Sequence, residues 1–144
     1  MAKQTFSAVT EIVQGLQVSC RSRSFEMIID EPEGLGGSDT GMSPVEALLN
    51  ALGACKCIVV QSFAPKFRIR LKSVRVEVEG VLDPAGFMGR DPEAKIGFSE
   101  IRSHFHIDAD NTPDEIARFV DFVEARCPVQ DTLTNPAICS HVIH

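Results

Sequence analysis

Thiols are the side chains of this 144-residue sequence with the most distinctive chemistry. The chain contains five cysteines: Cys20, Cys55, Cys57, Cys127 and Cys139. A thiolate attacks peroxides and disulfides and binds metals, whereas a buried thiol often only packs. An odd number of cysteines, with no apolar leader at the N-terminus, predicts a cytoplasmic protein without a structural disulfide framework. Any disulfide is then expected to be transient and chemical.

Cys55 and Cys57 lie in the segment ALLNALGACKCIVV, for which the sequence predicts a long helix. Ser43 is a good N-cap, Pro44 takes the first helical position and Glu46 the third, and the helix should run to about Phe63. The helix is apolar on nearly all sides, so we expect it to be central and buried. Two polar residues interrupt it, and we expect it to be too short to cross a bilayer.

Helical rotation separates the two thiols of this helix. Cys57 falls about 200° around the axis from Cys55, so neither a disulfide nor shared metal ligation between them is expected. Cys55 belongs instead to an apolar stripe with three- and four-residue spacing. The stripe consists of Leu48, Leu52, Cys55 and Val59.

A second helix carries Cys127 at its end. The segment TPDE (112–115) is a capping box with proline at the first helical position, and the helix should end near Arg126, before Pro128. Its apolar stripe consists of Ile116, Phe119 or Val120, Val123 and Cys127. If the two helices pack on their stripes, Cys55 and Cys127 approach each other. That arrangement suits a reactive cysteine with its resolving partner, or two thiols that simply pack.

A thiolate on Cys55 requires an external cation. Cys55 lies about three turns into its helix, beyond the useful reach of the helix dipole, and Cys127 lies at a helix C-terminus, where the dipole opposes ionisation. The candidate cations are Arg21 and Arg23, which should share one face of a strand. If neither arginine contacts Cys55, both are expected to be solvated charges at a sheet edge.

Alternating apolar and polar residues predict the strands that surround these helices. The expected strands cover 5–13 and 16–30, joined by a turn at Gln14 and Gly15, then 73–83, 97–110 and a short strand within 135–144. The glycine-rich run GLGGSDTG, within the loop 31–44, is expected to be a flexible connector. The order predicts one α+β domain, a sandwich with a largely antiparallel sheet.

The net charge and the positions of the histidines bear on two other classes of function, binding to nucleic acid or membranes and binding of zinc. The net charge of −6 argues against nucleic acid or an anionic membrane as the main partner. His104 and His106 share a strand face and could form a zinc site with Cys139 and His141, but this spacing is a weak signal.

The two cysteine segments together resemble those of the OsmC-like proteins, whose branches include osmotically inducible protein C and the organic hydroperoxide resistance protein. The resemblance starts near residue 15 and is carried by DEPEGLGGSDTGMSPVEALLNALGACKC, VRVEVEGVLDPAGFMG, GFSEI and RCPVQDTLTNP. It implies an intertwined homodimer with a long buried central helix. The N-terminal hairpin (1–30) would be exchanged between subunits, and two active sites would lie at the interface.

The resemblance also implies a reaction, the thiol-dependent reduction of organic hydroperoxides in oxidative-stress defence. Cys55 corresponds to the peroxidatic cysteine and Cys127 to the resolving cysteine. An external dithiol, of the lipoyl type in some members, would reduce the resulting disulfide, and no metal or organic cofactor is implied.

One position departs from the peroxidase branches of the family. There, a glutamate follows the proline of the helix start and holds the catalytic arginine, whereas here Val45 follows Pro44 and Glu46 comes one residue later. One residue corresponds to about 100° of helix rotation. The expected catalytic residues are Cys55, Cys127, Arg21, Arg23 and Glu46. The alternatives are a non-catalytic dimer that senses oxidants or binds a small apolar ligand, and a purely structural dimer.

Overall fold

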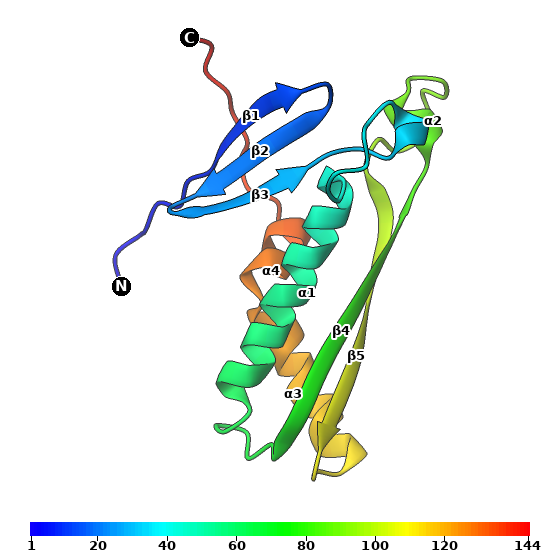
Figure 1. Cartoon of the computed structure of the whole chain (residues 1–144). Helices are drawn as coiled ribbons and strands as arrows, with labels where there is room; N and C mark the ends of the chain where they lie inside the picture. Colours follow the sequence, from blue (N-terminus) through cyan, green and yellow to red (C-terminus); the bar gives the residue numbers. More distant parts are fainter. The chain divides into compact units, whose positions relative to one another are not determined.

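The computed structural model describes residues 1–144, which form two compact units, Met1–Leu48 and Leu49–His144. The boundary between the units falls within helix α1 (Pro44–Phe63), which is continuous across it (Figure 1). The sheets are separate: three strands lie in the first unit and two in the second, and every strand pair is antiparallel. A mixed α+β fold with antiparallel sheets is therefore present, as predicted.

The first unit is a three-stranded sheet of β1 (Val9–Gln14), β2 (Gln17–Ser22) and β3 (Phe25–Ile29), in that order. The expected turn is present, and Gly15 adopts a φ of 53° there. The segment 16–30, expected to be one strand, is divided by a second turn in which Arg23 has a φ of 55°. The N-terminal hairpin is therefore extended by a third strand, because the left-handed backbone at Arg23 reverses the chain.

The glycine-rich loop after β3 is held by a buried carboxylate. Asp30, which is 1% exposed, accepts hydrogen bonds from the Thr40 hydroxyl (2.6 Å) and from the backbone N–H groups of Glu31, Ser38 and Thr40. These bonds, that of the Thr40 hydroxyl first, lower the pKa of Asp30 to about 2. Gly37 passes so close to the backbone of Glu31 that a Cβ would lie 1.9 Å from its carbonyl oxygen. The loop also contains the short 3-10 helix η1 (Glu33–Leu35). It was expected to be a flexible connector, but the bonds to Asp30 fix its backbone at both ends of the glycine-rich run.

Helix α1 has the predicted bounds and the predicted capping box. The Ser43 N–H donates to Glu46 Oε2 (3.1 Å), and the Glu46 N–H donates to Ser43 Oγ (3.3 Å). By length and mean hydropathy the helix could cross a membrane, contrary to expectation, but a core helix passes the same test. It is not buried on all sides, because Ile58 is 65% exposed. In a single chain, only one face of α1 is covered.

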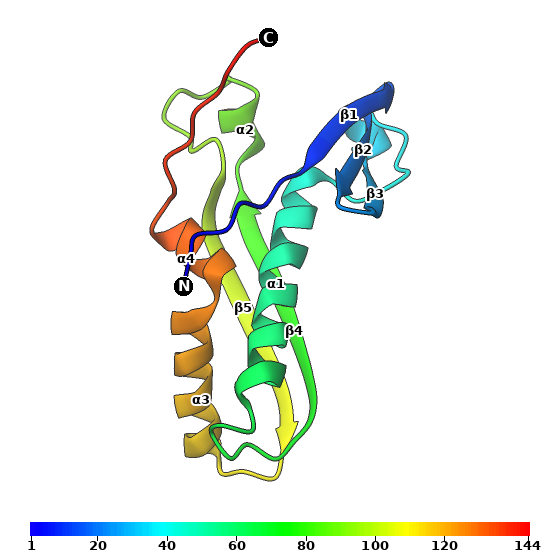
Figure 2. The same ribbon diagram turned by 90° about the vertical axis from the view of Figure 1, so that its left-hand side faces the viewer.

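The second unit packs helices on a hairpin. Strands β4 (Leu71–Leu82) and β5 (Phe98–Ala109) are antiparallel, and α1 and α3 (Pro113–Arg126) lie side by side on one face of them (Figures 1 and 2). The core joins buried residues of both helices and the segment after α1: Val59, Val60, Ala64, Ile69, Phe119 and Val123. Gly53 permits the close approach of α1 to β4, because a Cβ at residue 53 would lie 3.3 Å from Val78 Cγ2.

Three short segments of this unit differ from expectation. Two short helices, α2 (Pro84–Phe87) and α4 (Pro128–Thr134), occupy segments for which no helix was predicted. The expected strand within 135–144 is wrong, since these residues are exposed and lie in neither helix nor strand. Apolar alternation alone does not make a strand, because the backbone of a strand must pair with a neighbouring one.

Candidate functional site

Cys55 and Cys127 lie in contact within the second unit. Their Sγ atoms are 2.9 Å apart, with Cys127 as the donor, and both are free thiols. Cys127 is 1% exposed, whereas Cys55 is half-buried and therefore the more accessible sulfur. The approach predicted from the two helical stripes is present. The pair is close enough to form a disulfide after a small movement, once an oxidant has removed two electrons.

Cys127 occupies a junction between two helices. Its backbone N–H donates to Val123 O (3.1 Å) as the C-cap of α3, and its Sγ accepts the Gln130 N–H (3.4 Å) as the N-cap of α4. The sequence analysis placed Cys127 only at the end of α3. The available signal for α4 was Pro128, because proline is favoured at the first position of a helix.

The surroundings of Cys127 favour its neutral form. Burial raises the pKa of the Cys127 thiol, and its hydrogen bond to Cys55 acts in the same direction, against the weaker effect of the Gln130 N–H. The thiol form of Cys127, which donates to the sulfur of Cys55, is therefore favoured. The two sulfurs therefore differ in exposure: Cys55 is the more accessible acceptor of the hydrogen bond, and Cys127 is its buried donor.

Lys56 directly follows Cys55 on α1, and the burial of its side chain was not predicted. Its Nζ lies 2.7 Å from Glu124 Oε1 and 2.7 Å from Ser103 Oγ, and 5.6 Å from the centre of the Phe105 ring. The side chain is 2% exposed. The sequence did contain a signal, since Lys56 follows Leu52 by four residues and therefore falls on the buried face of α1.

The expected cations and acid lie in the first unit. The Arg21 guanidinium is exposed and lies 3.4 Å from Glu11 Oε2. Arg23 lies in the turn after β2, with its guanidinium 4.9 Å from the centre of the Phe25 ring. The expectation that the two arginines share one strand face is therefore wrong, because β2 ends at Ser22 and Arg23 lies in the turn that follows. Glu46 caps the start of α1, and the action of these residues on the cysteines stays a prediction.

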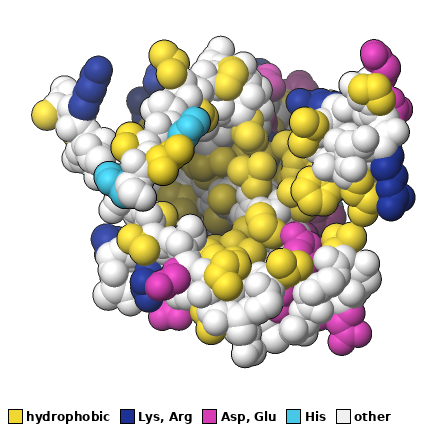
Figure 3. All heavy atoms as spheres, turned by 90° about the horizontal axis from the view of Figure 1, so that it is seen from above, with side chains coloured by type: hydrophobic (Ala, Val, Ile, Leu, Met, Phe, Trp, Pro, Cys, Tyr) yellow, Lys and Arg dark blue, Asp and Glu magenta, His cyan; other side chains and the backbone are white.

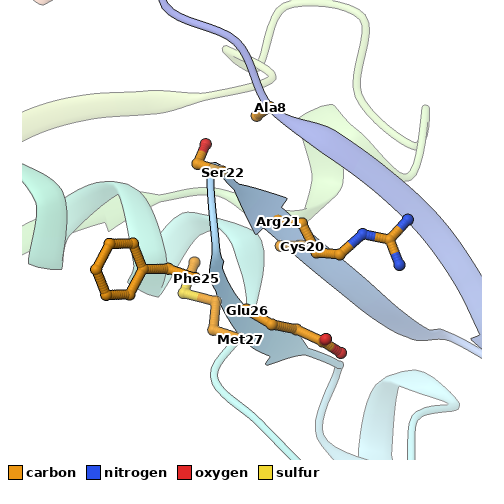
Figure 4. A pocket seen from close by; sticks show the side chains of 7 residues that line it. All are labelled: Ala8, Cys20, Arg21, Ser22, Phe25, Glu26 and Met27. Carbon is orange, nitrogen blue, oxygen red and sulfur yellow. The ribbon is translucent and has the colours of Figure 1, made fainter.

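The first unit also contains an apolar cavity of about 390 Å³ (Figure 4). It is lined by Ala8, Cys20, Arg21, Ser22, Phe25, Glu26 and Met27. Cys20 pairs with Met27 and Ser22 with Phe25 across β2 and β3, so these four side chains share one face of the sheet. The cavity is large enough for a small organic molecule.

The histidines of β5 pair with glutamates of β4. His104 Nε2 lies 2.9 Å from Glu79 Oε1, and His106 Nε2 lies 3.3 Å from Glu77 Oε2. The hydrogen bond from His106, and then that from Arg75, lowers the pKa of Glu77. The structure contains no cluster of three or more side chains able to hold a metal, so the weak zinc alternative gains no support.

Comparison with known proteins places this chain in a family. Residues 36–141 match the family model described as OsmC-like protein. The curated hydroperoxide reductases of Mycoplasma pneumoniae and Mycoplasma genitalium are 32% and 29% identical to the chain over 93 residues. Each match covers 65% of this chain and 62% of the relative, so the chain matches less than two thirds of their length.

Solved structures agree on the fold. An OsmC-like protein from Mycoplasma pneumoniae superimposes with a TM-score of 0.81 and 26% identity, covering 94% of this chain and 91% of the other. An organic hydroperoxide resistance protein OsmC from Legionella pneumophila gives a TM-score of 0.69 and 21% identity, covering 92% and 91%. Since the family model matches most of its length, this chain belongs to the OsmC-like protein family.

Proposed function

We propose that this protein reduces organic hydroperoxides in the cytoplasm, with Cys55 as the peroxidatic and Cys127 as the resolving cysteine. The observation that carries the proposal is the 2.9 Å separation of the two Sγ atoms, which come from α1 and the end of α3. The hydroperoxide reductase names of the two mycoplasma relatives support the substrate class.

In the first step, the Cys55 thiolate attacks the distal oxygen of the hydroperoxide. An S–O bond forms while the O–O bond breaks, the alkoxide takes up a proton to leave as an alcohol, and Cys55 becomes a sulfenic acid. The greater exposure of Cys55 supports this assignment, because the substrate must reach the attacking sulfur.

In the second step, Cys127 gives up its proton and attacks the sulfur of the sulfenic acid. Water leaves and a disulfide forms, for which the sulfurs must approach to about 2.05 Å. An external dithiol, for example of the lipoyl type, then supplies two electrons and two protons to restore both thiols. The buried position of Cys127 supports this role, since its proton is held beside the sulfur that it later attacks.

The proposal includes a homodimer. Large apolar side chains remain exposed on α1, with Val45, Leu48 and Ile58 at 42%, 37% and 65%, and hydrophobic atoms are visible on the surface in Figure 3. Exposed apolar patches of this kind are typical of interaction surfaces. We propose that exchange of N-terminal segments in this dimer allows Arg21 or Arg23, held by Glu46, to stabilise the Cys55 thiolate.

One observation favours a second candidate function. The apolar cavity beside Cys20 supports a dimer that binds a small apolar ligand or senses oxidants without turnover. Sustained consumption of hydroperoxide distinguishes the two functions, because a sensor stops after one equivalent.

The test follows the consumption of cumene hydroperoxide by the reduced protein with a lipoyl dithiol in excess. Cys55→Ser should abolish consumption. In a parallel assay without the dithiol, Cys127→Ser should stop after about one equivalent with a sulfenic acid on Cys55. Cys57→Ser is the matched control, a neighbouring thiol on the other side of the same helix, and should retain turnover. Wild-type consumption no greater than that of Cys55→Ser would refute the proposal.

A further inference from the structure

The ion pair between Lys56 and Glu124 joins the same two helices as the thiol pair. Lys56 follows Cys55 directly on α1, and Glu124 precedes Cys127 by three residues, which places their side chains about one turn apart along α3. The Lys56–Glu124 contact is 2.7 Å and the Cys55–Cys127 contact 2.9 Å. Two polar contacts thus bridge α1 and α3 side by side.

The Lys56 ammonium is fixed from two further directions. Ser103 Oγ on β5 accepts a hydrogen bond from it (2.7 Å), and the Phe105 ring centre lies 5.6 Å away. A lysine side chain that is 2% exposed loses its hydration, and such a burial is tolerated when the charge is paired and hydrogen-bonded. The pair thus ties α1, α3 and the hairpin together at the level of the cysteines.

We propose that Lys56 is a positioning residue for the Cys55–Cys127 redox pair: its bonds to Glu124 and Ser103 hold α1 and α3 close enough for the two sulfurs to form a disulfide after a small movement. The inference rests on the proposed function for the oxidant, but the disulfide equilibrium can be measured without one. When the ion pair is lost, the helices separate more easily, and the effective concentration of one thiol at the other falls.

The test compares wild type with Lys56→Met and with Glu124→Gln, the milder change because Glu124 is partly exposed. The Cys55–Cys127 disulfide is equilibrated with glutathione redox buffers and quantified by mass spectrometry. Both variants should lower its equilibrium constant by about tenfold, the size expected for the loss of one charge-assisted hydrogen bond. The charge-swapped variant Lys56→Glu/Glu124→Lys should recover part of this loss.

A stability control separates positioning from general loosening of the fold. Ile69→Ala removes packing from the core cluster of the same unit, against which Cys55 also packs, but leaves the ion pair intact. It should lower the melting temperature while lowering the disulfide equilibrium constant less than Lys56→Met does. With cumene hydroperoxide, Lys56→Met should form the Cys55 sulfenic acid at the wild-type rate but leave a larger fraction trapped by dimedone.

The outcomes of the two proposals remain distinguishable. If wild type consumes no hydroperoxide, the proposed function fails, and the glutathione equilibrium still decides the role of Lys56. Equal equilibrium constants in wild type and folded Lys56→Met or Glu124→Gln would overturn the positioning role. So would an Ile69→Ala equilibrium as low as that of Lys56→Met, because general destabilisation would then explain the effect.

Discussion

Cys55 and Cys127 are 72 residues apart in the sequence, and their Sγ atoms lie 2.9 Å apart. One sulfur is half-buried and the other fully buried. The contact joins the middle of α1 to the junction of α3 and α4, so three helices must pack correctly before the sulfurs meet. Redox chemistry at this pair therefore depends on the tertiary structure of the second unit.

Cys127 and Cys139 should differ strongly in their rates of alkylation. Cys127 is buried and its pKa is raised, so iodoacetamide at pH 8 should modify it at least about tenfold more slowly than the exposed Cys139. Mass spectrometry of peptides over time measures both rates in one sample. In guanidinium chloride the difference should vanish, and equal rates in the native protein would contradict the buried placement of Cys127.

Asp30→Asn should destabilise the protein in a pH-dependent manner. The folded-state pKa of Asp30 is lowered from 3.8 to about 2, so its stabilising contribution is present above pH 3.8 and is lost as the pH falls towards 2. The difference in urea midpoint between wild type and Asp30→Asn should be large at pH 6 and shrink between pH 4 and pH 2. The exposed Asp39→Asn is the control for the loss of a carboxylate from the same loop. A difference between wild type and Asp30→Asn that stays constant with pH would contradict the lowered pKa of Asp30.

Gly37→Ala should be much more damaging than Gly34→Ala, although both change the same loop. A Cβ on residue 37 would lie 1.9 Å from the Glu31 carbonyl oxygen, a backbone atom that cannot move freely, whereas nothing lies within 4 Å at residue 34. We expect Gly37→Ala to cost about 1–3 kcal/mol of unfolding free energy. Gly34→Ala should change it by about 0.5 kcal/mol or less. Urea denaturation measures both, and equal effects would contradict the close backbone approach.

Ile58→Glu should weaken the proposed dimer. Ile58 is 65% exposed on α1, and a charge there opposes burial at an interface. Light scattering after size exclusion should give about twice the 15.7 kDa chain mass for wild type and 15.7 kDa for the variant at micromolar concentration. Ile96→Glu, at 69% exposure but outside α1, controls for the added charge. A wild-type mass of 15.7 kDa at every concentration would refute the dimer.

Local signals in the sequence were sufficient for the elements that carry the cysteines. Ser43 and Thr112 begin α1 and α3 as predicted, because capping depends on residues within one turn. The valine alternation of 73–83 predicted β4, since side chains of a strand alternate between faces. Helical rotation also separated Cys57 from Cys55 without any tertiary information.

Other features depend on contacts between distant segments. The turn at Arg23, the position of Asp30 under the glycine-rich loop and the role of Cys127 as an N-cap were not predicted. Lys56 is the clearest case, because its spacing from Leu52 places it on the buried face of α1 but does not identify the partners of its charge. Its burial is possible only because Glu124 and Ser103 meet it from α3 and β5.

The sequence by itself determined which helix faces carry Cys55 and Cys127, because rotation per residue is a local property of the backbone. Their 2.9 Å contact, and the ion pair beside it, were decided by tertiary packing, because only the folded core places two distant helices at a given separation.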